Sequence, residues 1–100
     1  MKMLTIVCRE KLEGEVLALF KDLGIEEYTV MSGLGGKGQT GAVSEHSWTD
    51  RNMLFMVALG DHLLAPLVTA VKQLHARLLE AHLGKNVPLK IFLQSCEVIV

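Results

Sequence analysis

The sequence has no long hydrophobic run. Its longest apolar runs, such as residues 53–59, fall far short of the roughly 18 residues that a membrane-spanning helix requires. The first ten residues contain too short an apolar region, and no small-residue cleavage site, to form a secretory signal. We therefore expect a cytoplasmic protein that does not insert into a membrane.

Positive charge is neither abundant nor concentrated. Ten Lys and Arg residues are balanced by 11 Asp and Glu residues, the net charge is −1, and the basic residues are scattered along the chain. Proteins that bind nucleic acid concentrate Lys and Arg on one face or helix. The charge pattern therefore argues against DNA or RNA as a partner.

The sequence also offers little for catalysis. No Ser-His-Asp or Cys-His arrangement can be argued from it. Cys8 and Cys96, the two cysteines, form no C-x-x-C pair, and nothing else indicates a secreted disulfide scaffold. Free cysteines are usually buried, and a buried thiol without an activating neighbour is a poor nucleophile. We expect a non-enzymatic protein with reduced cysteines.

Apolar residues, by contrast, are in excess. Half of the 100 residues are hydrophobic even without the nine glycines, whereas a typical share is about 45–50% with glycine included. A chain of this length forms a single domain, residues 1–100, with a small core. The apolar excess therefore predicts a protein interface.

Strands and helices alternate along the chain. Short β-branched or apolar runs predict strands at residues 3–8, 25–31, 52–59 and 88–94, the last one continuing through 97–100. An apolar stripe predicts a helix over 12–23, which Gly24 ends in a left-handed conformation. A second stripe predicts a helix from Asp61, as N-cap, to Gly84, in which Pro66 is tolerable only in the first turn.

This order is that of the ferredoxin-like βαββαβ fold, an α+β fold with two helices on one face of a four-stranded antiparallel sheet. The first and third strands are apolar on both faces, so the face without helices also needs cover. A second copy of the chain is the simplest cover. In this topology Cys8 and Cys96 lie at opposite ends of neighbouring strands, too far apart for a disulfide.

The segment between the second and third strands, residues 32–50, shows neither helical nor strand periodicity. It contains five glycines and is longer than most structureless loops, which favours a functional loop that is mobile when free. Gly33, Gly35 and Gly38 match G-x-G-x-x-G, but no amphipathic helix follows them, so a dinucleotide fingerprint is excluded. Lys37 and Lys85 lack the spacing of a P-loop. An anion-binding nest of glycine N–H groups beside Lys37 and a flexible linker both remain open.

The histidines give a weak signal for metal. His75 and His82 are seven residues apart on the second predicted helix, about 10 Å along its axis, so one subunit cannot place both on one ion. We expect both to pack in a core or interface. His46 lacks a ligand spacing rule. Trp48, in the same loop, is expected to pack on the body or to contact a partner.

Taken together, these elements resemble the PII-like superfamily of trimeric signalling proteins over almost the whole chain. The resemblance depends on the order and spacing of four short stretches, Lys11-Leu12-Glu13, Gly24-Ile25, Gly33-Leu34-Gly35 and Lys90-Ile91-Phe92.

The resemblance implies a homotrimer that binds adenine nucleotides in clefts between subunits. It also implies a flexible T-loop, about residues 32–50, that acts on a target protein such as a transporter, enzyme or regulator, with His46 and Trp48 in the partner-binding loop. The implied ligand-binding residues are Gly33, Gly35, Lys37 and Gln39 at the T-loop base, Lys90 at the phosphates, and Gly84 and Lys85 in place of the B-loop.

The sequence also departs from the family pattern. The stretch before Lys90 lacks most of the glycines of the classical B-loop, residues 91–100 contain no basic residue where the relatives have a basic tail, and the loop contains no tyrosine for modification. We therefore expect a divergent PII-like protein rather than a standard nitrogen regulator, with ATP, ADP or AMP as effector. Two alternatives stay open: a CutA-like trimer that binds metal through His46, His82 or the cysteines, and an interaction module that needs no ligand.

Overall fold

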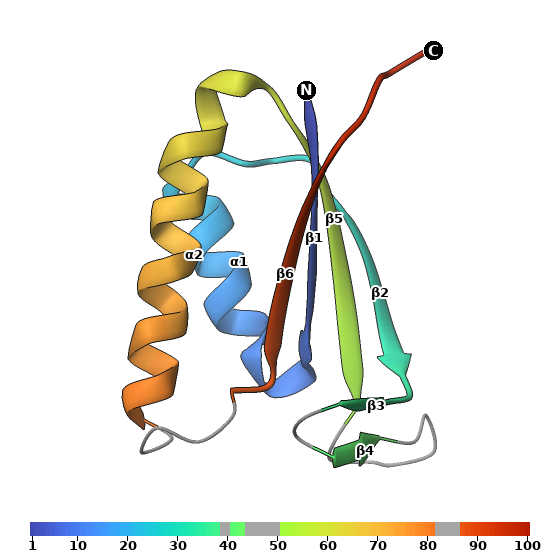
Figure 1. Ribbon diagram of the computed structural model, residues 1–100, viewed down its shortest axis with the longest axis vertical. Coiled ribbons are helices and arrows are strands. Elements are labelled where there is room, and N and C mark those ends of the chain that lie inside the picture. Colours follow the sequence, from blue (N-terminus) through green and yellow to red (C-terminus); the bar gives the residue numbers. More distant parts are fainter. Residues whose placement is uncertain (39–40, 44–50, 82–86) are drawn as a thin grey trace.

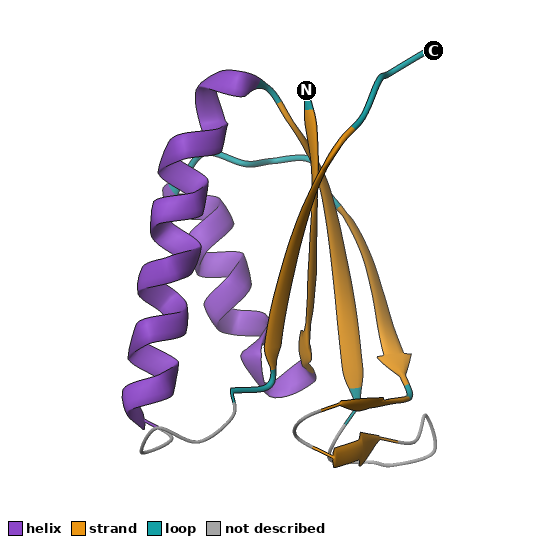
Figure 2. Ribbon diagram, in the orientation of Figure 1, coloured by secondary structure: helices purple, strands orange, loops and turns teal. Residues whose placement is uncertain are grey.

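The computed structural model describes residues 1–38, 41–43, 51–81 and 87–100 of the chain. Its main sheet has four antiparallel strands in the order β2-β5-β1-β6. Helices α1 and α2 form a second layer on one face of that sheet (Figures 1 and 2). This is the predicted ferredoxin-like βαββαβ fold. The elements are β1 (Lys2–Arg9), the 3-10 helix η1 (Glu10–Leu12), α1 (Glu13–Asp22), β2 (Thr29–Leu34), β5 (Asn52–Leu59), α2 (Asp61–Ala81) and β6 (Leu89–Ser95).

Gly24 ends α1 as predicted. Its φ of +72° lies in the left-handed region, which glycine adopts without a steric penalty. Its N–H donates to the carbonyl of Lys21 at 3.1 Å, and the N–H of Ile25 donates to the carbonyl of Phe20 at 2.9 Å. These two hydrogen bonds form a Schellman motif, which satisfies carbonyls at the helix end.

Two strands, β2 and β6, differ in extent from the prediction. β2 begins at Thr29 rather than at Ile25, because the chain uses the intervening residues to cross from the helix layer to the edge of the sheet (Figure 1). β6 ends at Ser95, and the apolar residues 97–100 continue without strand structure. A β-branched run forms a strand only where it has a neighbouring strand to pair with.

The expectation that Pro66 lies in the first turn of α2 was wrong. The helix begins at Asp61, so Pro66 falls in its second turn. Proline cannot donate a hydrogen bond to the preceding turn. Pro66 is exposed, so water can reach the carbonyl that is left without that donor.

The core lies between the sheet and the two helices. Alternate residues of β1 and β5 point into it, together with residues of both helices: Leu4, Ile6, Cys8, Met53, Phe55, Val57, Leu59, Val16, Leu19, Phe20, Leu67, Val71 and Leu74. Cys8 pairs with Leu89 at the start of β6, whereas the N–H of Cys96 donates to Met1 at the opposite end. Both cysteines are free, as predicted, but only Cys8 is buried. None of the described helices is long and apolar enough to cross a membrane.

The opposite face of the sheet, which we call the outer face, is also apolar. The residues that alternate with the core positions include Met3, Val7, Leu54 and Met56, and they are half-buried. Met31 and Phe92, which pair with outer-face positions of neighbouring strands, are 46% and 56% exposed. No described part of the chain covers this face, in agreement with the apolar excess of the sequence.

Candidate functional site

The glycine-rich segment begins with more strand structure than its sequence indicates. β2 continues through Ser32 and Gly33 to Leu34. β3 (Gly36–Gly38) and β4 (Gly41–Val43) then pair as a two-stranded antiparallel sheet (Figure 1). The expectation that residues 32–50 have no strand structure was therefore wrong. Glycine strands are held by backbone hydrogen bonds and show no alternation of apolar side chains, so periodicity cannot detect them.

Gly33 occupies a special backbone position at the base of this segment. The pairing of β2 with β5 shifts register between Met31 and Leu34, and Gly33 has a φ of +71° within the shift. A methyl group at Gly33 would lie 3.8 Å from Nη1 of Arg51, which is an ordinary contact. Backbone conformation, rather than space, therefore requires glycine here.

Glu10 holds the base of the segment together. Its Oε1 accepts a hydrogen bond from the N–H of Gly33 at 2.8 Å, and its own N–H donates to the carbonyl of Arg51 at 2.9 Å. Glu10 therefore connects η1, the end of β2 and the residue that precedes β5. Its carboxylate occupies a site at a backbone N–H that an anion could also use.

Two arginines, Arg9 and Arg51, lie at the end of the sheet where β2 leads into the glycine-rich segment. Arg9 is the last residue of β1, is only 9% exposed, and pairs with Asn52. Its N–H donates to the carbonyl of Pro88 at 3.2 Å. Arg9, Glu10 and Arg51 belong to no recognisable motif and were not among the predicted site residues. Their positions were nevertheless informative, since they follow one buried strand and precede its antiparallel neighbour, which places them at the same end of the sheet.

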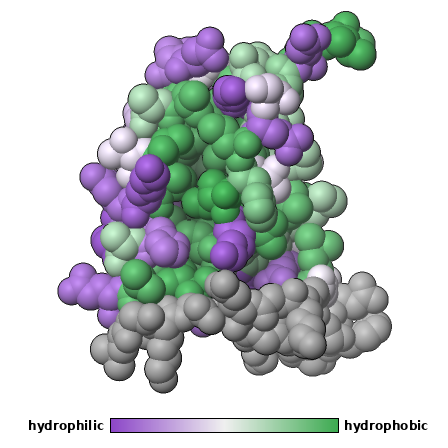
Figure 3. Space-filling model, in the orientation of Figure 1, coloured by the Kyte–Doolittle hydropathy of each residue, from purple (hydrophilic) through white to green (hydrophobic). Residues whose placement is uncertain are grey.

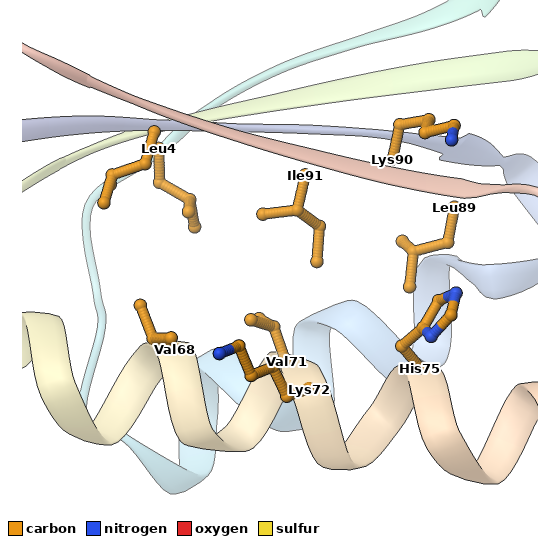
Figure 4. A pocket seen from close by; sticks show the side chains of 9 residues that line it. Leu4, Val68, Val71, Lys72, His75, Leu89, Lys90 and Ile91 are labelled. Atoms are coloured by element: carbon orange, nitrogen blue, oxygen red, sulfur yellow. The ribbon is translucent and has the colours of Figure 1, made fainter.

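Lys90 lies at this end of the sheet as well, but on the opposite edge from Gly33. It pairs with Val7, is exposed, and points away from α2 (Figure 4). The strand order places β2 and β6 at the two edges, and three strand spacings amount to about 14 Å. A single chain therefore does not bring Gly33 and Lys90 to one ligand.

Of the other predicted residues, the structure describes Gly35, Lys37 and His75. Gly35 is exposed and lies between β2 and β3, and Lys37 pairs with Ala42 in the β3–β4 sheet. The following predicted residues lie outside the described part of the chain: Gln39, His46, Trp48, His82, Gly84 and Lys85. His75 is exposed on α2, so it does not belong to the core of the chain.

A groove separates α2 from β6. It has a volume of about 620 Å³, and His75 and Lys72 project from α2 at its border (Figure 4). Apolar side chains form its walls, and Figure 3 shows them gathered in the hollow between helix and sheet. These side chains are Leu4, Val68, Val71, Leu89, Ile91 and Leu93.

The described residues offer no grouped metal ligands, and Cys8 is not a reactive thiol. Within residues 1–38, 41–43, 51–81 and 87–100, no three His, Cys, Asp or Glu residues are grouped closely enough to hold a metal ion. Burial, with a smaller contribution from the negative charge of Glu13, raises the pKa of Cys8 to about 11. The Cys8 thiol is therefore protonated at neutral pH and is unsuited to act as a nucleophile.

Comparison with known proteins gives one family. The chain matches the model of the nitrogen regulatory protein P-II family over residues 1–99. No curated protein matches it.

Solved structures with the same fold include CPII from Thiomonas intermedia K12. CPII bound to ADP and bicarbonate superposes with a TM-score of 0.73 at 20% identity, covering 93% of this chain and 82% of CPII. CPII bound to ADP, AMP and bicarbonate gives a TM-score of 0.72 at 18% identity, covering 97% and 90%. The apo form gives 0.64 at 22% identity, covering 93% and 85%.

Proposed function

The chain belongs to the nitrogen regulatory protein P-II family, and on that basis we propose that it is a non-enzymatic, trimeric regulatory protein that binds an adenine nucleotide between subunits. The observation that carries the proposal is the placement of the cationic and glycine groups. Arg9 and Lys90 stand near the β6 edge, whereas Gly33 and Arg51 stand near the β2 edge, all at the same end of the sheet.

A ring of copies would bring these two half-sites together. If the β2 edge of one copy faces the β6 edge of the next, each cleft receives Gly33 from one side and Lys90 from the other. Such head-to-tail contacts close into a ring when the rotation allows it. In a trimer the outer faces of the three sheets would meet at the centre, where Met31 and Phe92 would lose their contact with water.

The nucleotide assignment is supported by the relatives and by the chemistry of the half-sites. CPII has been solved with ADP and AMP. Backbone N–H groups of a glycine-rich segment, together with lysine and arginine, suit a phosphate chain. In this proposal Gly35, Lys37 and Gln39 contribute from the loop, and Gly84 and Lys85 contribute from the segment before β6.

Signalling would use the segment that follows Leu34. A nucleotide held at Gly33 changes the interactions at the base of the loop, and the loop, with His46 and Trp48, carries that change to a target protein. A transporter, an enzyme or another regulator suits this role.

Titration calorimetry of the purified oligomer with ATP, ADP and AMP tests the proposal. We expect heat with at least one nucleotide, and a loss of roughly tenfold or more in affinity for Lys90→Ala, because a charge-assisted phosphate contact is removed. Lys21→Ala is the matched control, since Lys21 is an exposed lysine in the last turn of α1 and belongs to neither half-site. Heat with zinc or copper alone would replace the proposal with a metal-binding trimer, and the absence of heat with either class would leave a ligand-independent interaction module.

A further inference from the structure

The N–H of Gly33 is an anion-binding group to which the chain offers its own carboxylate. The described pairs between β2 and β5 do not include Gly33, so its N–H lies outside that register. It donates instead to Oε1 of Glu10 at 2.8 Å, in a partly buried position. Glycine has no side chain that would shield this N–H from a second anion. The same group could therefore bind a ligand oxygen if the Glu10 carboxylate moved away.

A guanidinium group makes this position more favourable for anions. A methyl group placed on Gly33 would lie 3.8 Å from Nη1 of Arg51, so the cation is close to the glycine backbone. A backbone N–H and a neighbouring guanidinium are groups that bind both carboxylates and phosphates. The chemistry of the position therefore accepts a phosphate oxygen as readily as the side-chain carboxylate that it holds, since both are negatively charged acceptors.

The Glu10 side chain can leave the site without a change in the fold. Its backbone is held in place, because its N–H donates to the carbonyl of Arg51 at 2.9 Å and η1 ends at the buried Leu12. Its carboxylate, by contrast, reaches from the end of β1 to the edge strand β2, and η1 and the end of β2 lie at the same end of the sheet (Figure 1). Glu10 is only half-buried, so rotation of its side chain is enough to move the carboxylate into water.

We propose that Gly33 and Arg51 form an anion site, that Glu10 occupies it in the unliganded chain, and that a phosphate group of the ligand displaces the Glu10 carboxylate. That this phosphate belongs to a nucleotide rests on the proposed function. The base of the loop then has two alternative anchors, the carboxylate of Glu10 without ligand and a phosphate oxygen with ligand. Because the Glu10 contact joins η1 to β2, its loss changes how the glycine-rich segment leaves the sheet.

Competition from Glu10 lowers the affinity of the parent protein for the nucleotide. Displacing the carboxylate breaks a hydrogen bond to a charged group, and that loss is subtracted from the free energy of binding. By linkage, the bound nucleotide weakens the Glu10 contact to the same extent. Removal of the negative charge should therefore strengthen binding. If Glu10 only ordered the base of the loop for the ligand, its removal would weaken binding instead, so the two roles predict opposite signs.

Titration calorimetry of the full chain with ADP tests the competition. Glu10→Gln keeps the shape of the side chain and removes its charge, and we expect its affinity for ADP to rise by roughly tenfold. Glu15→Gln is the matched control, because Glu15 is an exposed glutamate in the first turn of α1 and its replacement changes the net charge by the same amount. An unchanged or lower affinity in Glu10→Gln would overturn the competition, and so would an equal gain in Glu15→Gln.

Amide NMR gives a second readout that does not depend on the size of the affinity change. Without ADP, the chemical shift of the Gly33 amide should differ between the parent protein and Glu10→Gln, because its acceptor is a carboxylate in one and an amide in the other. With saturating ADP the two shifts should coincide, since a phosphate oxygen is then the acceptor in both proteins. A difference that persists at saturation would mean that residue 10 stays on Gly33, which contradicts displacement.

Inorganic phosphate separates this proposal from the proposed function. In Glu10→Ala no carboxylate fills the site, so we expect phosphate to slow hydrogen exchange at Gly33, whereas sodium chloride at the same ionic strength should not. The parent protein, in which Glu10 fills the site, should respond less. Absence of any phosphate effect in Glu10→Ala would overturn the anion site.

The two failures are distinguishable. Protection of Gly33 by phosphate without ADP heat in any variant would reject nucleotide binding and support the anion site. ADP heat without a gain in affinity for Glu10→Gln would reject the competition and leave nucleotide binding intact.

Discussion

The N–H of Gly33 donates a hydrogen bond to Oε1 of Glu10 at 2.8 Å, and this contact joins the end of β2 to the turn that follows β1. The two residues are far apart in sequence, yet they determine how the glycine-rich segment leaves the sheet.

Glu10→Ala should loosen the base of the loop while leaving the fold intact. The N–H of Gly33 loses its carboxylate acceptor, and a partly buried hydrogen bond to a charged group contributes about 1.5–3 kcal/mol. Hydrogen exchange followed by NMR is expected to show faster exchange at Gly33 in the variant, with the amides of β1 and β5 unchanged. Unaltered exchange at Gly33 would mean that the contact does not hold the loop.

Gly33→Ala should destabilise the protein by about 1–2 kcal/mol, because its φ of +71° places a side chain in the left-handed region. Gly14→Ala is the matched control. Gly14 is helical in α1, with nothing within 4 Å of an added methyl group, and alanine there should stabilise by about 0.5–1 kcal/mol. Urea unfolding measures the free energy of unfolding of both variants. A change of the same sign in both would contradict the left-handed conformation assigned to Gly33.

The Cys8 thiol should make stability depend on pH in the alkaline range. Its folded pKa is raised from 9.0 to about 11, so between these values the unfolded chain releases the proton while the folded chain keeps it. The free energy of unfolding therefore falls as pH rises from about 9 to 11 and is unaffected by this group below that range. Cys8→Ala should remove this part of the pH dependence, which denaturant titrations at pH 8, 9 and 10 can detect. Equal slopes in the two proteins would refute it.

Phe92→Asp should weaken the oligomer. Phe92 pairs with Thr5 on the outer face, where the proposed trimer would bury it, and an unpaired carboxylate at a desolvated interface is strongly unfavourable. Sedimentation velocity at micromolar concentration is expected to show a shift toward the 11.0 kDa chain. Leu79→Asp is the control, because Leu79 is an exposed apolar residue of α2, in the other layer. A monomeric parent protein would contradict the trimer itself.

Patterns within short stretches of the sequence were sufficient to predict much of the fold. The apolar stripes predicted both helices, the strand at residues 52–59 matches β5, and Gly24 ends α1 as expected. Each of these features depends on residues within a few positions of one another, so the sequence contains the whole signal. The strand boundaries that were predicted wrongly depend on residues distant in sequence. β2 begins where it can pair with β5, and β6 ends where its pairing with β1 ends.

The residues of the candidate site likewise divide into those that a short motif identifies and those that only strand pairing identifies. Gly33 and Lys90 could be selected from short motifs, but Arg9, Glu10 and Arg51 could not, since none of them belongs to a recognisable motif. They gain meaning only because antiparallel pairing brings the end of β1 beside the start of β5.

The sequence by itself determined the order of the elements, the apolar excess that demands a second covered face, and the position of the glycine-rich segment, because composition and periodicity encode them directly. Only the tertiary structure decided that Glu10 holds Gly33, that Gly33 and Lys90 stand on opposite edges of one sheet, and that an open groove follows β6. Strand order and register create these relationships, since they juxtapose residues across distances that no local pattern spans.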